Sequence, residues 1–443
     1  MTNQEHLLDQ QTEQIVVQKV IRRLVPFLAL LYAFNILDRT NVTIAALQMK
    51  QALNFSDKVY GMGVGIFFIG YFLFEVPSNL IMERVGARRW IARIMITWGA
   101  ISASLMFIKT PLSFYTLRFL LGIAEAGFYP GIILYLTYFI PMTSRAKVIS
   151  RFLSVTALVG LIGAPLGGLL LKMNGIMGLA GWQWLFLLEG LPSFVIGFGV
   201  LIWLPNMPVN AKWLSAEEVE WLEGRHKLEE QNSLRVKHLS PRVFLSDPRV
   251  VIICLIFIIS STGGNGIGAF VPQMLKSRAE GMWSDSFIAT ITVIPGLVGA
   301  IAMVLASGHS DRTGNRRQHI FVGYTLGGLA YLACSFFSHS AAITLGWLAV
   351  NALGERIAAS SYWALSTNLL GARAIAGGIA FINSVGNLGG FFGPLIMAEI
   401  KTHDHGGYTK GLYFSMTCYI IAGSLVFLLR HIPTAPIQEM SSD

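Results

Sequence analysis

Long apolar blocks alternate with short polar breaks along the whole chain. Most blocks approach or exceed the roughly 20 residues that an α-helix needs to cross a bilayer. Placing the breaks at charged, polar, Gly or Pro clusters predicts about twelve spans: 25–47, 60–82, 90–108, 112–139, 148–171, 184–204, 250–275, 286–307, 318–338, 341–369, 375–399 and 408–430. The pattern therefore predicts an all-α membrane protein with twelve transmembrane helices.

The longest interruption of this pattern is a polar stretch, Pro205 to Arg249, which separates six spans from six. It contains Ser215-Ala216-Glu217-Glu218, which is typical of a capped start to a short polar helix. We therefore expect five parts: an N-terminal segment 1–24, a six-helix bundle 25–204, a linker 205–249, a second six-helix bundle 250–430 and a tail 431–443.

The composition excludes an ordinary soluble protein, since 53% of the 443 residues are hydrophobic and only 13% are charged, against about 25% charged residues in soluble domains. The three cysteines lie far apart inside apolar blocks, without metal-ligand spacing, and we expect no metal site. A nucleotide loop of the G-x-x-x-x-G-K type is missing from the sequence, which argues against ATP-driven transport.

The charges indicate an orientation. The net charge is +9, and about two thirds of the 33 Lys and Arg lie at the chain ends and in the breaks on the same side as both termini. The positive-inside rule then places both termini in the cytoplasm. Because the positive charge is explained in this way, we expect a lipid bilayer as partner and no nucleic acid.

The break after the second block and the break after the eighth carry the same motif. Glu83-Arg84-Val85-Gly86-Ala87-Arg88-Arg89 matches Asp311-Arg312-Thr313-Gly314-Asn315-Arg316-Arg317, acid for acid and arginine for arginine. Two duplicated six-helix halves are the economical explanation, and such internal repeats are common in secondary transporters.

This paired motif resembles the signature of the major facilitator superfamily. The resemblance implies two pseudo-symmetric six-helix bundles. It also implies a cytoplasmic clasp that bridges neighbouring helices when the transporter faces outward. The residues that match the clasp are Glu83, Arg84, Arg88, Asp311, Arg312 and Arg316.

Longer motifs are similar to the anion:cation symporter family within that superfamily. They are Leu37-Asp38-Arg39-Thr40-Asn41-Val42, the segment from Arg118 to Gly131, and the segment from Gly181 to Pro192. The family resemblance is closest to bacterial permeases for tartrate, sugar acids and 4-hydroxyphenylacetate. It implies a proton-coupled carrier of small organic anions in the bacterial inner (plasma) membrane.

Charged residues inside the spans are the main functional candidates, because each costs several kcal/mol in a bilayer. Arg118 and Glu125 are two helical turns apart and share a face, so a network with Asp38 and Arg39 is expected. The resemblance implies that Asp38 and Glu125 bind the coupled proton. Arg39 is the candidate for gripping a substrate carboxylate through two hydrogen bonds, and Arg118 is a further substrate contact. A static ion-pair network is the alternative.

The resemblance to sugar-acid permeases also implies that four further residues line the cavity: Tyr71, Ser360, Trp363 and Asn383. Asn387 lies one turn after Asn383 and shares its face. Helix packing is the alternative role for Tyr71 and Trp363.

Glu355-Arg356 is a departure from the related permeases. Arg356 lies seven residues before Trp363, on the same helical face, so we hypothesise that it gives a second anion contact, as a dicarboxylate would need. Local pairing with Glu355 is the alternative.

Together these features predict a monomeric secondary transporter that takes up a small organic anion with protons, powered by the proton gradient without a cofactor. An antiporter that exports amphipathic compounds is the second hypothesis. A membrane-embedded enzyme or sensor is the third, but neither a catalytic constellation nor a signalling domain supports it.

Overall fold

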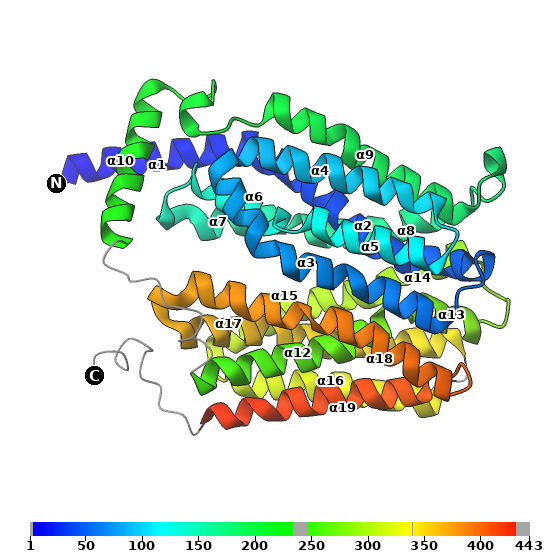
Figure 1. Cartoon of the computed structure of the whole chain (residues 1–443). Helices are drawn as coiled ribbons and strands as arrows, with labels where there is room; N and C mark the ends of the chain where they lie inside the picture. The colour runs from blue at the N-terminus through cyan, green and yellow to red at the C-terminus, as the bar shows by residue number, and fades with distance from the viewer. Residues whose placement is uncertain (1–2, 234–246, 339, 431–443) are drawn as a thin grey trace.

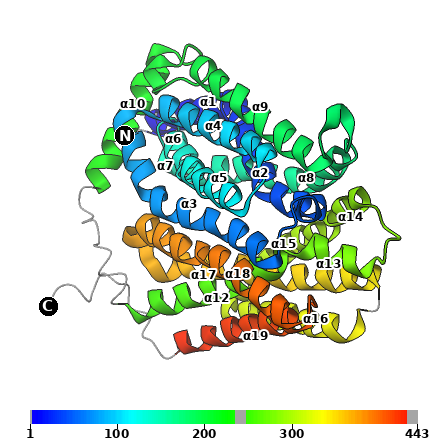
Figure 2. The ribbon, with the colours of Figure 1, turned by 45° about the vertical axis from the view of Figure 1, so that its right-hand side comes forward.

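The computed structural model describes residues 3–233, 247–338 and 340–430. In the part of the chain that it describes, every regular element is a helix. Figures 1 and 2 show the helices side by side, with the N-terminal half in one layer and the C-terminal half in the other. The predicted all-α membrane fold is confirmed.

The N-terminal half begins with α1 (Asn3–Arg23), which lies outside the apolar bundle (Figure 1). The bundle itself consists of α2 (Val25–Ala52), α3 (Asp57–Val85), α4 (Ala87–Ser104), η1 (Leu105–Phe107), α5 (Pro111–Glu125), α6 (Phe128–Thr137), α7 (Met142–Leu153), α8 (Val155–Leu171), η2 (Ile176–Gly178) and α9 (Gly181–Trp203). η3 (Pro208–Asn210) and α10 (Ala216–Ser233) follow in the linker.

The C-terminal half consists of α12 (Pro248–Gly268), α13 (Val271–Arg278), α14 (Asp285–Ile291), α15 (Val293–Thr313), α16 (Arg316–Phe337), α17 (Ala341–Asn387), α18 (Gly389–His403), α19 (Thr409–Leu425) and η4 (Val426–Arg430). Of the described helices, ten stretches are long and apolar enough to cross a membrane. An eleventh is added if the bent pair Gln11–Arg23 and Val25–Ala52 forms one span.

Several predicted spans are two helices in the structure. The predicted span 112–139 breaks between α5 and α6 at Gly127, whose φ of 83° lies in the left-handed region that favours glycine. Interruptions with helical backbone angles, at Ser154 and Thr292, separate α7 from α8 and α14 from α15.

The predicted break at 370–374 falls within α17, and a further interruption follows at Leu388. Phe257 packs against both Trp363 and Gly386. A straight helix would place those two positions about 35 Å apart, so the chain reverses direction between them, as two separate spans on either side of 370–374 require.

The two halves repeat the same packing pairs. In the N-terminal half α3 packs on α5 and α4 on α9, and in the C-terminal half α15 packs on α17 and α16 on α19. The halves meet where α3 faces α18 and where α8 faces α14 and α15. This arrangement encloses the central cavities between them.

We call the side of the bundle where α1 and α10 lie the terminal side, at the left of Figure 1, and the opposite side the far side. On the far side, four residues form what we call the far-side latch: Lys50, Asp57, Gln273 and Lys401. Lys50 of α2 pairs with Asp57 of α3 and donates to Gln273 Oε1 of α13 at 2.8 Å. Lys401 of α18 reaches the same Asp57 carboxylate at 3.2 Å.

Two further hydrogen bonds join the halves on the far side. Lys276 Nζ donates to the Leu47 carbonyl at 2.8 Å, and the Tyr60 hydroxyl donates to the Ala269 carbonyl at 2.7 Å. The halves are thus held together at the end of the bundle away from α1 and α10.

Candidate functional site

Arg39 and Glu125 form an ion pair inside the N-terminal half. The Nε–H of Arg39 on α2 donates to Oε1 of Glu125, the last residue of α5. Glu125 is buried, and its Oε2 has no hydrogen-bond partner among the described residues. The Arg39 guanidinium lies 4.8 Å from the centre of the Tyr71 ring. Tyr71 thus supports the cation of this pair.

Arg118 is buried at the centre of α5, two helical turns before Glu125, with 2% of its surface exposed. Its Nε donates to the Gly63 carbonyl at 3.1 Å, and the guanidinium lies 4.8 Å from the Phe67 ring centre. Its Nη1 has no hydrogen-bond partner among the described residues. Part of the hydrogen-bonding capacity of this cation is therefore available.

Asp38 points away from Arg39, because neighbouring positions on a helix differ by about 100°. Its buried carboxylate accepts hydrogen bonds from Trp98 Nε1 at 2.6 Å, Ser102 Oγ at 2.6 Å and Asn41 Nδ2 at 3.0 Å. Two of these donors belong to α4. Asp38 therefore fastens α2 to α4 and makes no described ion pair with Arg39 or Arg118.

Two cavities lie between the halves. The smaller, of about 240 Å³, is lined by Arg39 and Arg118 together with Phe67. The larger, of about 610 Å³, extends along α12 and α17. The two cavities adjoin each other, because they share four lining residues: Thr40, Thr43, Asn265 and Gly268.

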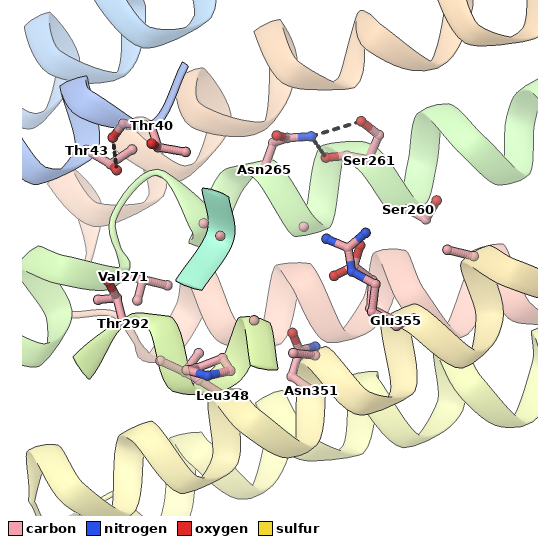
Figure 3. A pocket seen from close by; sticks show the side chains of 18 of the residues that line it. Thr40, Thr43, Ser260, Ser261, Asn265, Val271, Thr292, Leu348, Asn351 and Glu355 are labelled. Carbon is pink, nitrogen blue, oxygen red and sulfur yellow. Dashed lines mark hydrogen bonds between the residues drawn. The ribbon is translucent and has the colours of Figure 1, made fainter. Parts of the chain in front are cut away.

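Figure 3 shows the walls of the larger cavity. Thr40 and Thr43 lie on one side and Asn351 and Glu355 on another, with Asn265 of α12 between them. Asn265 Nδ2 donates to Ser261 Oγ at 2.9 Å. Polar groups from both halves thus face one space.

Sequence reasoning missed the tyrosines of this cavity. Tyr324, Tyr331 and Tyr419 all line it, and the Tyr324 hydroxyl donates to Ser260 Oγ at 3.0 Å. Tyr324 and Tyr331 are seven residues apart on α16, a spacing that places two polar-tipped side chains on one face. This spacing in the sequence could have identified Tyr324 and Tyr331 as candidate cavity residues.

The predicted residues of the C-terminal half divide into two groups. Arg356, Trp363 and Asn387 line the larger cavity. Ser360 and Asn383 are not among its lining residues, and the Ser360 hydroxyl donates to the Ile357 carbonyl of its own helix at 3.0 Å. Trp363 stacks edge-on against Phe257, with ring centres 5.4 Å apart.

Arg356 makes no hydrogen bond or ion pair with any residue that the structure describes, and this holds for Glu355 as well. The alternative of a local pair between these neighbours is therefore not seen. Both side chains belong to the wall of the larger cavity.

The predicted clasp residues lie at the ends of α3 and α15 and at the starts of α4 and α16. Glu83 and Arg84 are exposed, and no ion pair joins them or Arg88 to another described side chain. In the second copy Arg316 Nη1 donates to the Ala364 carbonyl at 2.9 Å, within its own half, and Arg312 is exposed. The side chain of Asp311 lies outside the described residues.

One buried acid lies where α3 meets the C-terminal half. Glu75 Oε2 accepts a hydrogen bond from Ser384 Oγ of α17 at 3.0 Å. Among the described residues no group of three or more His, Cys, Asp or Glu could hold a metal ion.

Known proteins resemble this chain over nearly its whole length. A family model described as Major Facilitator Superfamily matches residues 28–394 and 253–438. A protein of Agrobacterium vitis named "Putative tartrate transporter" is 44% identical over 94% of this chain and 92% of its own length. A protein of Acinetobacter baumannii named "Quinolone resistance transporter" is 38% identical over 91% of this chain and 92% of its own length.

A solved structure has the same fold. It is a bacterial homolog of the human lysosomal transporter Spinster, with a TM-score of 0.75 at 19% identity, and the match covers 91% of this chain and 95% of that one. The duplicated helix pattern, the central cavities and these matches agree. The chain belongs to the Major Facilitator Superfamily of membrane transporters.

Proposed function

We propose that this protein is a symporter that takes up a small organic anion together with protons, by alternating access. The anion is a carboxylate of the sugar-acid, tartrate-like or aromatic class. The observation that carries the proposal is the Arg39–Glu125 ion pair beside a cavity that Arg39 also lines. Segments 25–204 and 250–430 are the two moving units, and the proton gradient supplies the energy.

In this proposal Glu125 and the substrate compete for Arg39. An ionised Glu125 holds the guanidinium, whereas a protonated Glu125 loses the charge-assisted part of that bond. The released guanidinium can then grip a substrate carboxylate with two parallel hydrogen bonds. Arg118 lines the same cavity, and its Nη1 offers a further donor.

Asp38 has a different role in the same proposal. Its carboxylate receives three hydrogen bonds, two of them from α4. A proton on Asp38 would weaken these bonds, because hydrogen bonds to a charged acceptor are roughly twice as strong as neutral ones. α2 would then be looser against α4, and α2 also carries Arg39. Protonation of Asp38 is thus coupled to movement of the substrate-binding helix.

The positive-inside rule places the terminal side in the cytoplasm of a bacterial cell, with the protein in the inner membrane. The far-side latch is then external, and the described conformation faces inward. After the anion leaves, the Arg39–Glu125 pair forms again, so Arg39 is not an unpaired charge in the membrane when the empty carrier returns.

Uptake into proteoliposomes tests this proposal. Tartrate, an aldonate and an aromatic acid are offered as radiolabelled substrates, with the outside either more acidic than the inside or at equal pH. We expect at least one of them to accumulate only with the proton gradient. Accumulation that is equal with and without the gradient contradicts symport.

A second candidate function is proton-driven export of amphipathic compounds, which the quinolone resistance relative supports. The same vesicles distinguish it. Gradient-driven efflux of a fluorescent quinolone, without uptake of any carboxylate, would favour export over the proposed symport.

A further inference from the structure

Arg356 presents a cation to the larger cavity without an ion pair to any described group. Arg39, by contrast, pairs with Glu125, and Arg118 donates to the Gly63 carbonyl. Arg356 forms no hydrogen bond or ion pair with a described residue. A charge inside the membrane is costly without a partner, so the site is arranged for an anion that enters from outside the chain.

The two arginine regions belong to one connected space. Thr40, Thr43 and Asn265 line both the smaller cavity, to which Arg39 belongs, and the larger cavity, to which Arg356 belongs. Figure 3 shows Thr40 and Thr43 facing this space from α2, and Asn265 facing it from α12. Hydroxyl and amide groups therefore belong to the walls of both cavities.

Glu355 restricts what can bind near Arg356. It lines the same cavity as Tyr324, Tyr331 and Tyr419. An ionised carboxylate only accepts hydrogen bonds, so it favours substrate hydroxyl groups beside it and repels additional acidic groups. The wall around Arg356 thus has one place for an anion and a neighbouring place for a hydroxyl group.

We propose that the substrate is a hydroxylated dicarboxylate that spans the two halves. One carboxylate binds at Arg39 and Arg118, the second binds at Arg356, and the hydroxyl groups between them bond to Thr40, Asn265 and Glu355. This inference rests on the proposed transport of carboxylates and narrows it to a dianion. It also gives each half one charged contact with the same molecule, so that binding favours closure of the halves around it.

Three four-carbon acids test separately whether the substrate needs a second carboxylate and whether it needs hydroxyl groups. Tartrate has two carboxylates and two hydroxyls, threonate replaces one carboxylate by a hydroxymethyl group, and succinate lacks the hydroxyls. We expect the purified full-length protein to bind tartrate at least about tenfold more tightly than either of the others, since each loses charge-assisted or neutral hydrogen bonds. Equal or tighter binding of threonate would overturn the proposal.

Variants of Arg356 test whether this residue binds the second carboxylate of tartrate. Arg356→Gln should weaken tartrate binding and uptake about tenfold or more and leave threonate unchanged, whereas Arg356→Lys should restore part of the tartrate affinity. Equal losses for tartrate and threonate would mean that Arg356 serves the fold or the transport cycle instead. If Arg356→Gln does not fold, the Lys variant and the three wild-type affinities still decide.

The same experiment separates this inference from the proposed function. Gradient-driven uptake of threonate, with no preference for tartrate, would refute the dicarboxylate and keep the symporter. Absence of uptake for all carboxylates would refute both.

Discussion

Arg39 on α2 donates its Nε–H to the carboxylate of Glu125 at the end of α5, and it does so at the edge of the smaller cavity. The adjacent residue Asp38 is instead bound by neutral donors on α2 and α4. The two acids of the site therefore have different partners. We expect their substitutions to have different effects.

Arg39→Lys should keep the ion pair with Glu125 and lose the planar, two-bond grip on a substrate carboxylate. We expect substrate affinity to fall by about 10- to 100-fold, which corresponds to roughly 1.5–3 kcal/mol for a hydrogen bond to a charged group. Isothermal titration with the transported anion measures this. Arg84→Lys, at an exposed arginine without a described ion pair, is the matched control and should bind normally.

Asp38→Asn should reduce the proton movement that accompanies the substrate, because the amide cannot take up a proton at this position whereas Glu125 still can. A pH-sensitive dye outside proteoliposomes should report alkalinisation when substrate is added to the wild-type protein, and a smaller change with the variant. Ser102→Ala removes one donor to Asp38 but keeps the carboxyl group, so it should still move protons. Normal alkalinisation with Asp38→Asn would remove Asp38 from the coupling mechanism.

Weakening the far-side latch should shift the protein from conformations closed on the far side towards conformations open there. Asp57→Asn removes the one carboxylate that faces both Lys50 and Lys401. A weakening of about 1–2 kcal/mol changes the ratio of far-side-closed to far-side-open molecules by roughly 5- to 30-fold. Spin labels at the exposed positions Met177 and Met282, in a cysteine-free background, should report longer distances by pulsed EPR.

The matched control for the latch is Lys58→Met, which breaks the ion pair between Lys58 and Glu399. Both of those side chains are about half exposed, at 53% and 51%, and such pairs contribute little. We expect the spin-label distances to stay unchanged. If both variants shifted the distances equally, the latch would have no special role.

Much of the fold could be predicted from the sequence, because a helix that crosses a bilayer must be long and apolar. The interruption between α17 and α18 at Leu388 could not. It lies inside the apolar block 375–399, where hydropathy shows no break, and the two arms of α17 are brought together by packing against Phe257. Those contacts are tertiary, and hydropathy does not contain them.

The candidate site was predictable in composition but not in pairing. Charge inside a span identified Asp38, Arg39, Arg118 and Glu125, yet only one ion pair joins them in the structure. The direction in which each side chain points from its helix decides which charged residues pair. A sequence motif on one helix does not identify the partner on another helix.

The far-side latch was missed for a similar reason. In the sequence Lys50, Asp57 and Lys401 count only as charges in short breaks. Asp57 and Lys401 are far apart in the chain, and only the packing of α3 on α18 brings them together.

The contact between α1 and the linker helix α10, outside the membrane, should depend on pH. Burial alone would raise the pKa of Glu218, but hydrogen bonds from Lys19 and Ser215 outweigh it and lower that pKa. A lowered pKa in the folded protein stabilises the contact between α1 and α10 above the ordinary pKa of about 4.3, and this contribution disappears as the pH falls through the lowered value.

Hydrogen exchange of α1 measures this contact. At neutral pH, Lys19→Met should speed exchange in α1 a few-fold, because a partly exposed ion pair contributes at most about 1 kcal/mol. Acidification below the lowered pKa should remove the difference between the variant and the wild-type protein. Identical exchange at neutral pH would show that the pair does not hold α1.

The central claim is that Glu125 exchanges Arg39 for a proton and a substrate carboxylate. Glu125→Gln mimics the protonated acid, so Arg39 stays available for substrate while the proton site is lost. In proteoliposomes this variant should exchange labelled for unlabelled substrate at a rate near that of the wild-type protein, and it should fail to accumulate substrate when a proton gradient is imposed. Accumulation at the wild-type level by Glu125→Gln would contradict the account.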